Sequence, residues 1–230
     1  MGSSSHNFMR WFRGAGTSPA GRGESTASAP RIPRRSTALG DFMRSLRPVG
    51  EEKLRILDLG PTSPDNIAFL TKLGLRVYNE DLLRAAQELS CKVSRESAVE
   101  GEDAAGQASE QRFFAENLGY PQSHFDAVLF WDVLEYLPEP LVTPLVERIQ
   151  GMLKPHGTLL AFFHAKDPGP ESNCNRYHIV QADTVELERK AAVRLQRIFQ
   201  NRHIENLFKD FASRKFFLGR DNIREVIVVR

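Results

Sequence analysis

The chain has 230 residues, of which 41% are hydrophobic and 26% charged, as in an ordinary globular protein. This length accommodates one α/β domain with a substantial core and a flanking tail. The formal net charge of +2 indicates no class of partner, and no apolar run approaches the roughly 20 residues that span a bilayer.

The two cysteines, Cys91 and Cys174, exclude a disulfide framework, and no spacing typical of metal ligands appears. The first residues lack the long apolar segment of a secretory signal. We therefore expect a reduced, cytoplasmic setting and no bound metal.

Residues 1–36 are rich in Ser, Gly, Pro, Ala and Arg and show no sustained apolar period. Such a composition buries too little surface to offset the entropy of ordering, so we predict a disordered basic tail. Its charge allows contact with nucleic acid or an anionic membrane, although a solvated tail is the simpler interpretation. Residues 37–230 are expected to form the folded domain.

Helical and strand periods alternate after the tail. Ser36 is a candidate N-cap for a helix over residues 37–46, and the apolar run 54–59 predicts a buried strand. A helix over 64–73 and a second strand over 75–78 follow.

The middle of the chain is less clearly patterned. A helix is expected over residues 82–93, and the acidic, small-residue stretch 94–111 is typical of a loop. We predict a short strand at Phe113 and Phe114.

The second half predicts, in order, a strand over 125–130, a helix over 140–153, a strand over 158–163, a long helical region over 183–211, and closing strands over 215–218 and 225–229. Strands alternating with helices favour an α/β fold. We expect a doubly wound, mainly parallel sheet of seven strands with an antiparallel C-terminal strand and helices on both faces.

The turn after the first strand of that sheet is the first candidate site. A strand that leads into a tight turn and a helix points backbone N–H groups and a positive dipole end toward the carboxyl edge of the sheet. Gly60 would let the polar part of a nucleotide-like cofactor approach the backbone. Asp81 ends the second strand, where an acid can accept hydrogen bonds from ribose hydroxyls. The alternative is that Asp81 only caps the helix starting at Leu82.

Two later segments indicate which nucleotide-like cofactor is expected. Residues 125–137 (FDAVLFWDVLEYL) resemble the fourth-strand segment of class I methyltransferases that use S-adenosylmethionine (SAM). Residues 152–160 (MLKPHGTLL) resemble that family's turn into strand five, and the closing strands resemble its antiparallel hairpin. With the turn at Gly60, these segments occur in the family's order. The resemblance implies a Rossmann-like methyltransferase fold, SAM as cofactor and methyl transfer as the activity.

The resemblance also implies roles for individual residues. Asp58 and Gly60 would lie beside the methionine part of SAM, Asp81 would hold the ribose, and Asn117 and Leu118 would lie near the adenine.

The end of the fourth strand would carry the chemistry. The resemblance implies that Trp131 and Asp132 face the methyl group and the substrate, although ordinary packing would also explain Trp131. Asp132, Glu135 and His164 are the polar candidates for a catalytic base; a structural histidine is an equally good interpretation of His164.

The sequence departs from the family at several positions. Thr62 and Pro64 stand where glycines are usual, Phe114 replaces an acid, and Tyr136 replaces a common histidine. The Thr62 hydroxyl could still bind the cofactor, so we expect an active methyltransferase. The alternative is an inactive relative that binds or scaffolds, and a nicotinamide-dependent oxidoreductase is a distant third.

The acceptor is expected to be a small molecule. No Asn-Pro-Pro-Tyr-type segment follows the fourth strand, which argues against methylation of bases in nucleic acid. Five basic residues in the predicted C-terminal helix would form either an anionic-substrate surface or a solvated helix face: Arg189, Lys190, Arg194, Arg197 and Arg202. The oligomeric state cannot be inferred from the sequence.

Overall fold

Six strands form the main sheet in a computed structural model that describes residues 30–47, 52–96, 102–169, 173–219 and 221–230. In spatial order they are β3 (Arg76–Asn79), β2 (Arg55–Asp58), β4 (Phe125–Trp131), β5 (Leu153–His164), β9 (Ile223–Val229) and β8 (Ser213–Leu218). The first four are parallel, and β9 runs antiparallel to both of its neighbours. Chain order reverses between β2 and β4, so their carboxyl ends flank a topological switch point, where ligands bind in sheets of this kind.

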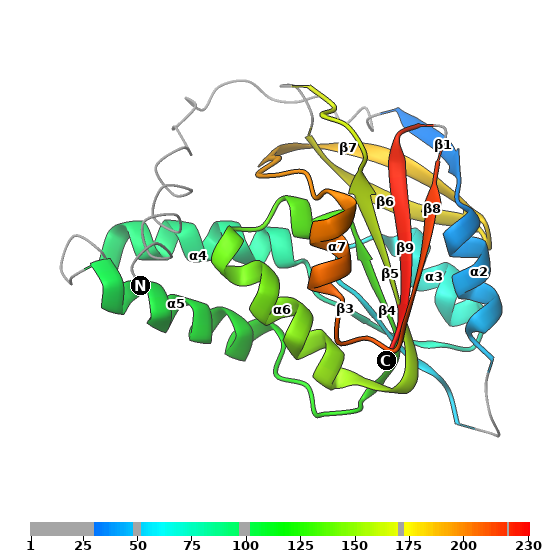
Figure 1. Ribbon diagram of the computed structural model, residues 1–230, viewed down its shortest axis with the longest axis horizontal. Coiled ribbons are helices and arrows are strands. Elements are labelled where there is room, and N and C mark those ends of the chain that lie inside the picture. The colour runs from blue at the N-terminus through cyan, green and yellow to red at the C-terminus, as the bar shows by residue number, and fades with distance from the viewer. Residues whose placement is uncertain (1–29, 48–51, 97–101, 170–172, 220) are drawn as a thin grey trace.

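Helices cover both faces of this sheet, as predicted (Figure 1). They are α2 (Thr37–Ser45), α3 (Pro64–Lys72), α4 (Leu82–Glu96), α5 (Glu102–Asn117), α6 (Glu139–Met152) and α7 (Asn201–Leu207). One core packs α4, α5, α6 and α7 on one face, and the other core packs α2 and α3 on the opposite face. Alternation along β4 separates the cores: Val128 and Phe130 belong to the first, Leu129 and Trp131 to the second.

A second, antiparallel sheet has the order β1-β7-β6, formed by β1 (Arg31–Arg35), β7 (Thr184–Arg194) and β6 (Asn173–Gln181). In Figure 1 it lies across the top of the view. The backbone N–H of Ile179 in β6 donates to Asn66 Oδ1 in α3 at 2.7 Å. Tyr177 of β6 stacks on Trp131 at the end of β4. The small sheet therefore covers the carboxyl end of β4.

The prediction of a long helix over residues 183–211 is wrong. Residues 184–194 form β7, an irregular segment follows, and only residues 201–207 are helical, as α7. Val185 and Leu187 alternate with Glu186 and Glu188, which is the period of a strand. The alternation is hard to separate from an amphipathic helix because the neighbouring charges also fit a helical face.

The predicted loop over residues 94–111 and the predicted strand at Phe113 and Phe114 are also wrong. α4 continues to Glu96, and α5 covers Glu102–Asn117. Both phenylalanines are buried in the core between helices, so their hydrophobicity serves helix packing. The main sheet consequently has six strands and ends at β3, where a seventh had been expected.

The domain begins earlier than the predicted boundary between residues 36 and 37. Arg34 of β1 is buried, and its Nη1 lies 2.6 Å from Glu225 Oε1 in β9. Ser36 caps α2 as predicted, because its Oγ accepts from the backbone N–H of Leu39 at 3.0 Å. Residues 1–29 lie outside the described residues, so their disorder stays a prediction. Among the described residues, no helix is both long and apolar enough to cross a bilayer.

Candidate cofactor and active site

The turn between β2 and α3 has Thr62 and Pro64 at the positions where glycines were expected. Ser63 caps α3, its Oγ accepting from the backbone N–H of Asn66 at 3.2 Å. Pro64 occupies the first turn of the helix, where a missing N–H removes no helical hydrogen bond. The departure at Pro64 is thus compatible with a regular helix start.

Asp58 lies at the centre of this turn and is buried. Its Oδ1 accepts from Trp131 Nε1 at 2.7 Å and from the Gly60 N–H at 3.3 Å, and its Oδ2 accepts from Asn66 Nδ2 at 3.0 Å. Burial raises the pKa of Asp58 from 3.8 to about 6, although these three hydrogen bonds oppose the rise. A buried carboxylate of this kind is suited to binding a cationic group.

Trp131 covers Gly60. The residue ends β4 with a φ of 50°, which is rare for a bulky side chain, and the β4–β5 register shifts at this point. A Cβ added to Gly60 would lie 2.5 Å from Trp131 Cδ1, well inside the roughly 3.5 Å of a carbon–carbon contact. The Tyr177 ring stacks on the indole with centroids 5.0 Å apart. Gly60 therefore has the predicted open face, and in this structure the indole fills that face.

Thr62 and Asp81 make local contacts. The Thr62 hydroxyl donates to Asn79 Oδ1, and Asn79 Nδ2 donates to the carbonyl oxygen of Asp58 at 3.1 Å. Asp81 Oδ1 accepts from the Arg84 N–H at 3.0 Å, so this residue does cap α4. Asp81 nevertheless stays half-buried, close enough for its charge to raise the pKa of Asp58. Both predicted residues thus border the Asp58 turn.

The predicted adenine-edge residues make contacts along α5 and with α6. Asn117 Nδ2 donates to the Phe113 carbonyl at 2.8 Å. Leu118 is buried, and its carbonyl accepts from Arg148 Nε at 2.9 Å. These contacts explain both residues by packing, so their role toward adenine stays a prediction.

A cluster of ionisable groups joins the ends of β4 and β5. Glu135 lies in a short 3₁₀ turn, η1 (Val133–Glu135), and its Oε2 is 2.6 Å from His164 Nδ1. The same carboxylate accepts from the His164 backbone N–H at 3.0 and 3.2 Å. Burial alone would lower the pKa of His164, but the hydrogen bond and charge of Glu135 outweigh it and raise that pKa. Because Nδ1 is engaged, Nε2 is the nitrogen left to act on a substrate.

Asp132 adjoins this pair. It is 1% exposed, and its Oδ2 accepts from the Tyr177 hydroxyl at 2.9 Å. Its Oδ1 is buried without a hydrogen-bond partner among the described residues. Burial raises the pKa of Asp132 from 3.8 to about 7, against the opposing charge of His164 and the Tyr177 hydrogen bond. The structure therefore brings the two predicted catalytic residues, Asp132 and His164, into one electrostatic cluster.

Sequence reasoning missed Tyr177, Asn66 and the role of Glu135 as the partner of His164. Tyr177 lies in a segment without a recognised element, yet it contacts both Trp131 and Asp132. The signal available in the sequence was the spacing of two apolar residues, Tyr177 and Ile179, at the period of a strand, and both are buried.

A protein-family model described as a methyltransferase domain matches residues 32–211. The chain belongs to this family of methyltransferase domains. The protein is therefore a methyltransferase-domain enzyme.

Solved structures with similar folds include the 1,6-didemethyltoxoflavin-N1-methyltransferase of Burkholderia thailandensis, at 16% identity over 85% of this chain and 79% of that one, with a TM-score of 0.45. A SAM-dependent methyltransferase from Mesorhizobium loti is 16% identical over 82% of this chain and 95% of that one, with a TM-score of 0.44. The [4+2]-cyclase SpnF is 14% identical over 84% and 78%, with a TM-score of 0.45. At these scores the likenesses carry no argument about function. No curated protein matches the sequence.

The residues of the domain fit SAM unequally. The polar groups suit it, because a buried carboxylate, Asp58, can accept from an ammonium group and an acid, Asp81, stands at the end of β3. The space above Gly60 has no room for the cofactor while the Trp131 side chain occupies it. The methionine end of SAM therefore fits this turn only when the indole leaves Gly60.

Proposed function

We propose that the protein transfers the methyl group of SAM to a small-molecule acceptor at the carboxyl ends of β2, β4 and β5. Bound SAM supplies an electrophilic methyl group, so the protein needs chiefly to align an acceptor and remove its proton. The observation that carries this proposal is the buried cluster of Asp132, Glu135 and His164. A scaffold gains nothing from burying three ionisable groups, which is costly and common in active sites. An inactive binding role is therefore not favoured.

The residues of the turn would hold the cofactor. Asp58 would exchange the indole N–H of Trp131 for the ammonium group of SAM, since both are hydrogen-bond donors to the same oxygen. Gly60 would then present bare backbone to the cofactor, and Asp81 would accept from the ribose hydroxyls.

His164 would act as the base. Glu135 holds Nδ1, which fixes the ring and leaves Nε2 to accept a proton from the acceptor. Because the pKa of His164 is raised above its ordinary value of 6.5, the ring loses its proton only at a higher pH. Turnover should therefore increase as the pH rises through this raised pKa.

The test is formation of S-adenosylhomocysteine from SAM, measured by mass spectrometry with the small-molecule fraction of a cell extract as acceptor source. We expect product above the enzyme-free control, and a loss of about 100-fold or more in His164→Gln, the usual contribution of a general base. His203→Gln is the matched control, because His203 is exposed on α7. Product formed only with the macromolecular fraction would contradict the small-molecule acceptor, and no product with either fraction would contradict the enzyme.

A further inference from the structure

A cavity of about 410 Å³ lies beside the end of β7. Residues 194–198 form one side, and Asp167 and Gly169 of the segment after β5 form the other. This volume lies within the range of small-molecule sites, roughly 300–1,000 Å³. Arg197 and Ile198 also line a second cavity, of about 530 Å³, beside α6 and α7.

Arg197 carries a half-buried positive charge at this cavity. Its Nη1 donates to the carbonyl oxygens of Leu137 at 2.7 Å and Leu134 at 3.4 Å. In the described part of the chain no carboxylate lies within ion-pair distance of it. Burial lowers the pKa of Arg197, and the more distant charges of Glu139 and Glu135 oppose this only in part. A desolvated cation without a counter-ion favours binding of an anion.

Arg194 adds a second positive charge. Its side chain is exposed and, among the described residues, has no ion-pair partner. The single acid among the described lining residues is Asp167, whose Oδ1 accepts from the Gly169 N–H at 2.8 Å. Two arginines against one aspartate leave the lining with a net positive charge.

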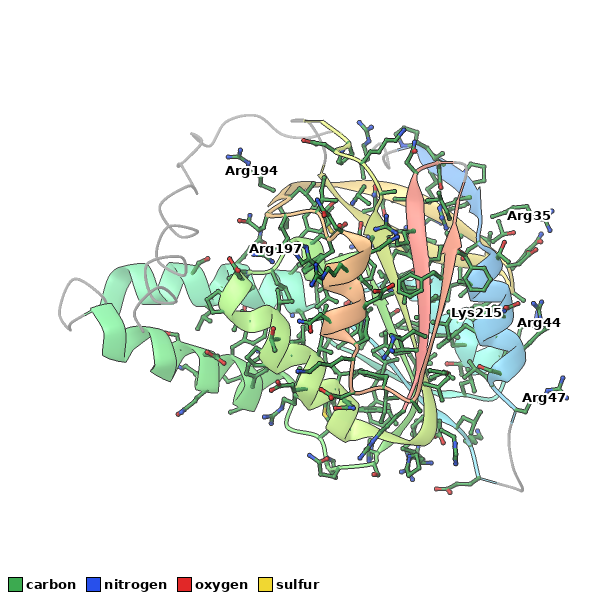
Figure 2. The ribbon with its side chains drawn as sticks, in the orientation of Figure 1. Arg35, Arg44, Arg47, Arg194, Arg197 and Lys215 are labelled. Carbon is green, nitrogen blue, oxygen red and sulfur yellow. The ribbon has the colours of Figure 1, made fainter. Side chains whose placement is uncertain are left out.

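Three exposed cations on another part of the surface differ in this respect. Figure 2 shows Arg35, Arg44 and Lys215 on the side of α2 and β8, away from Arg194 and Arg197. Each of those three is paired with an aspartate, either Asp183 or Asp41. Neighbouring aspartates thus neutralise these three cations, whereas Arg194 and Arg197 have no such partner among the described residues.

The cavity is joined to the candidate base by direct contacts. The backbone N–H groups of Gln196 and Arg197 donate to the carbonyl oxygen of Glu135 at 2.9 and 3.3 Å, and the Glu135 carboxylate holds His164. The segment that lines the cavity is therefore held by the same residue, Glu135, that positions the candidate base.

We propose that the methyl acceptor carries an oxyanion, a carboxylate or a phosphate, which Arg194 and Arg197 bind in this cavity. This inference rests on the proposed function and names the chemical class of its acceptor. Arg197 supplies the desolvated, pre-positioned charge, and Arg194 closes over the anion from the exposed side.

The test uses side-chain NMR of the arginine Nε–Hε groups in the full-length protein, titrated with benzoate, phenyl phosphate and the neutral isostere benzamide. We expect the Arg197 signal to shift saturably with at least one anion and not with benzamide. Benzoate alone would indicate a carboxylate, and phenyl phosphate alone would indicate a phosphate.

Arg194→Gln should weaken anion binding roughly tenfold, as for loss of a hydrogen bond to a charged group. It changes an exposed side chain, so folding should be unaffected, and Arg202→Gln, at an exposed position of α7, is the matched control. No saturable shift with either anion, equal binding of benzamide, or unchanged affinity in Arg194→Gln would overturn the proposal. These titrations contain no SAM, so their outcome is independent of cofactor binding and of turnover.

Discussion

Replacing Gly60 with alanine tests whether the indole of Trp131 really occupies the cofactor turn. The added methyl group would lie 2.5 Å from Trp131 Cδ1 and 3.2 Å from Nε1, whereas carbon atoms in contact are about 3.5–4.0 Å apart. The ring must move by about 1 Å, which breaks or weakens its 2.7 Å hydrogen bond to Asp58. Overpacking costs about 1–3 kcal/mol, and a lost hydrogen bond to a charged group costs about 1.5–3 kcal/mol. Gly60→Ala should therefore lower the free energy of unfolding by about 3–5 kcal/mol.

The assay is urea unfolding of a double-mutant cycle with Trp131→Ala. The three atoms nearest to the added methyl group all belong to the indole, so without the indole its effect should fall below about 1 kcal/mol and the coupling should exceed about 2 kcal/mol. An equal effect of Gly60→Ala in both backgrounds would refute the reasoning, because the conflict would then lie with the backbone and not with Trp131.

Three further predictions concern buried charge. Arg34→Ala should lower the free energy of unfolding by about 3–5 kcal/mol, since it leaves the buried carboxylate of Glu225 without its ion-pair partner. Arg35→Ala is the control: this side chain is 84% exposed, so the same thermal or urea melt should show a change of less than about 1 kcal/mol. Because the pKa of Asp58 is raised from 3.8 to about 6, the folded state binds more protons in that interval, and Asp58 should contribute a fall in stability of about 3 kcal/mol from pH 4 to pH 7, at 1.36 kcal/mol per unit of pKa. Asp132, whose pKa is raised to about 7, acts in the same direction, so Asp58→Asn should reduce the total fall by the share of Asp58, and an unchanged slope would contradict the assignment. Glu135→Gln should lower the pKa of His164, followed by NMR, because Glu135 makes the largest contribution that opposes burial, ahead of Asp132 and Asp167; an unchanged pKa would show that Glu135 is not the main cause of the raised value.

Several features of the fold and of the candidate site were predictable because their sequence signals are local. The strand before Gly60, the cap at Ser36 and the acid at Asp81 follow from short patterns of polarity and turn residues. The family resemblance also located Asp132 and His164 at strand ends, where the structure has them.

The features that were missed or wrongly predicted depend on contacts between residues distant in sequence. Trp131 lies 73 positions from Asp58, to which it donates, and its position depends on a rare backbone conformation that no propensity predicts. Tyr177 reaches the site through the second sheet, which was not predicted: β1 was assigned to the tail, β6 to no element and β7 to a helix. In β7 the alternation of Val185 and Leu187 with glutamates competes with a helical interpretation, and only pairing with β1 and β6 decides between them.

The most direct measurement of the central claim is a calorimetric titration of the full-length protein with SAM and with S-adenosylhomocysteine. The account predicts saturable binding of both, weakened more than tenfold by Asp81→Ala through loss of the ribose hydrogen bonds and unchanged by Asp183→Ala in the distant β6–β7 turn. Unchanged affinity in Asp81→Ala would show that the ribose contact is misplaced. No binding of either ligand at millimolar concentration would contradict the account as a whole.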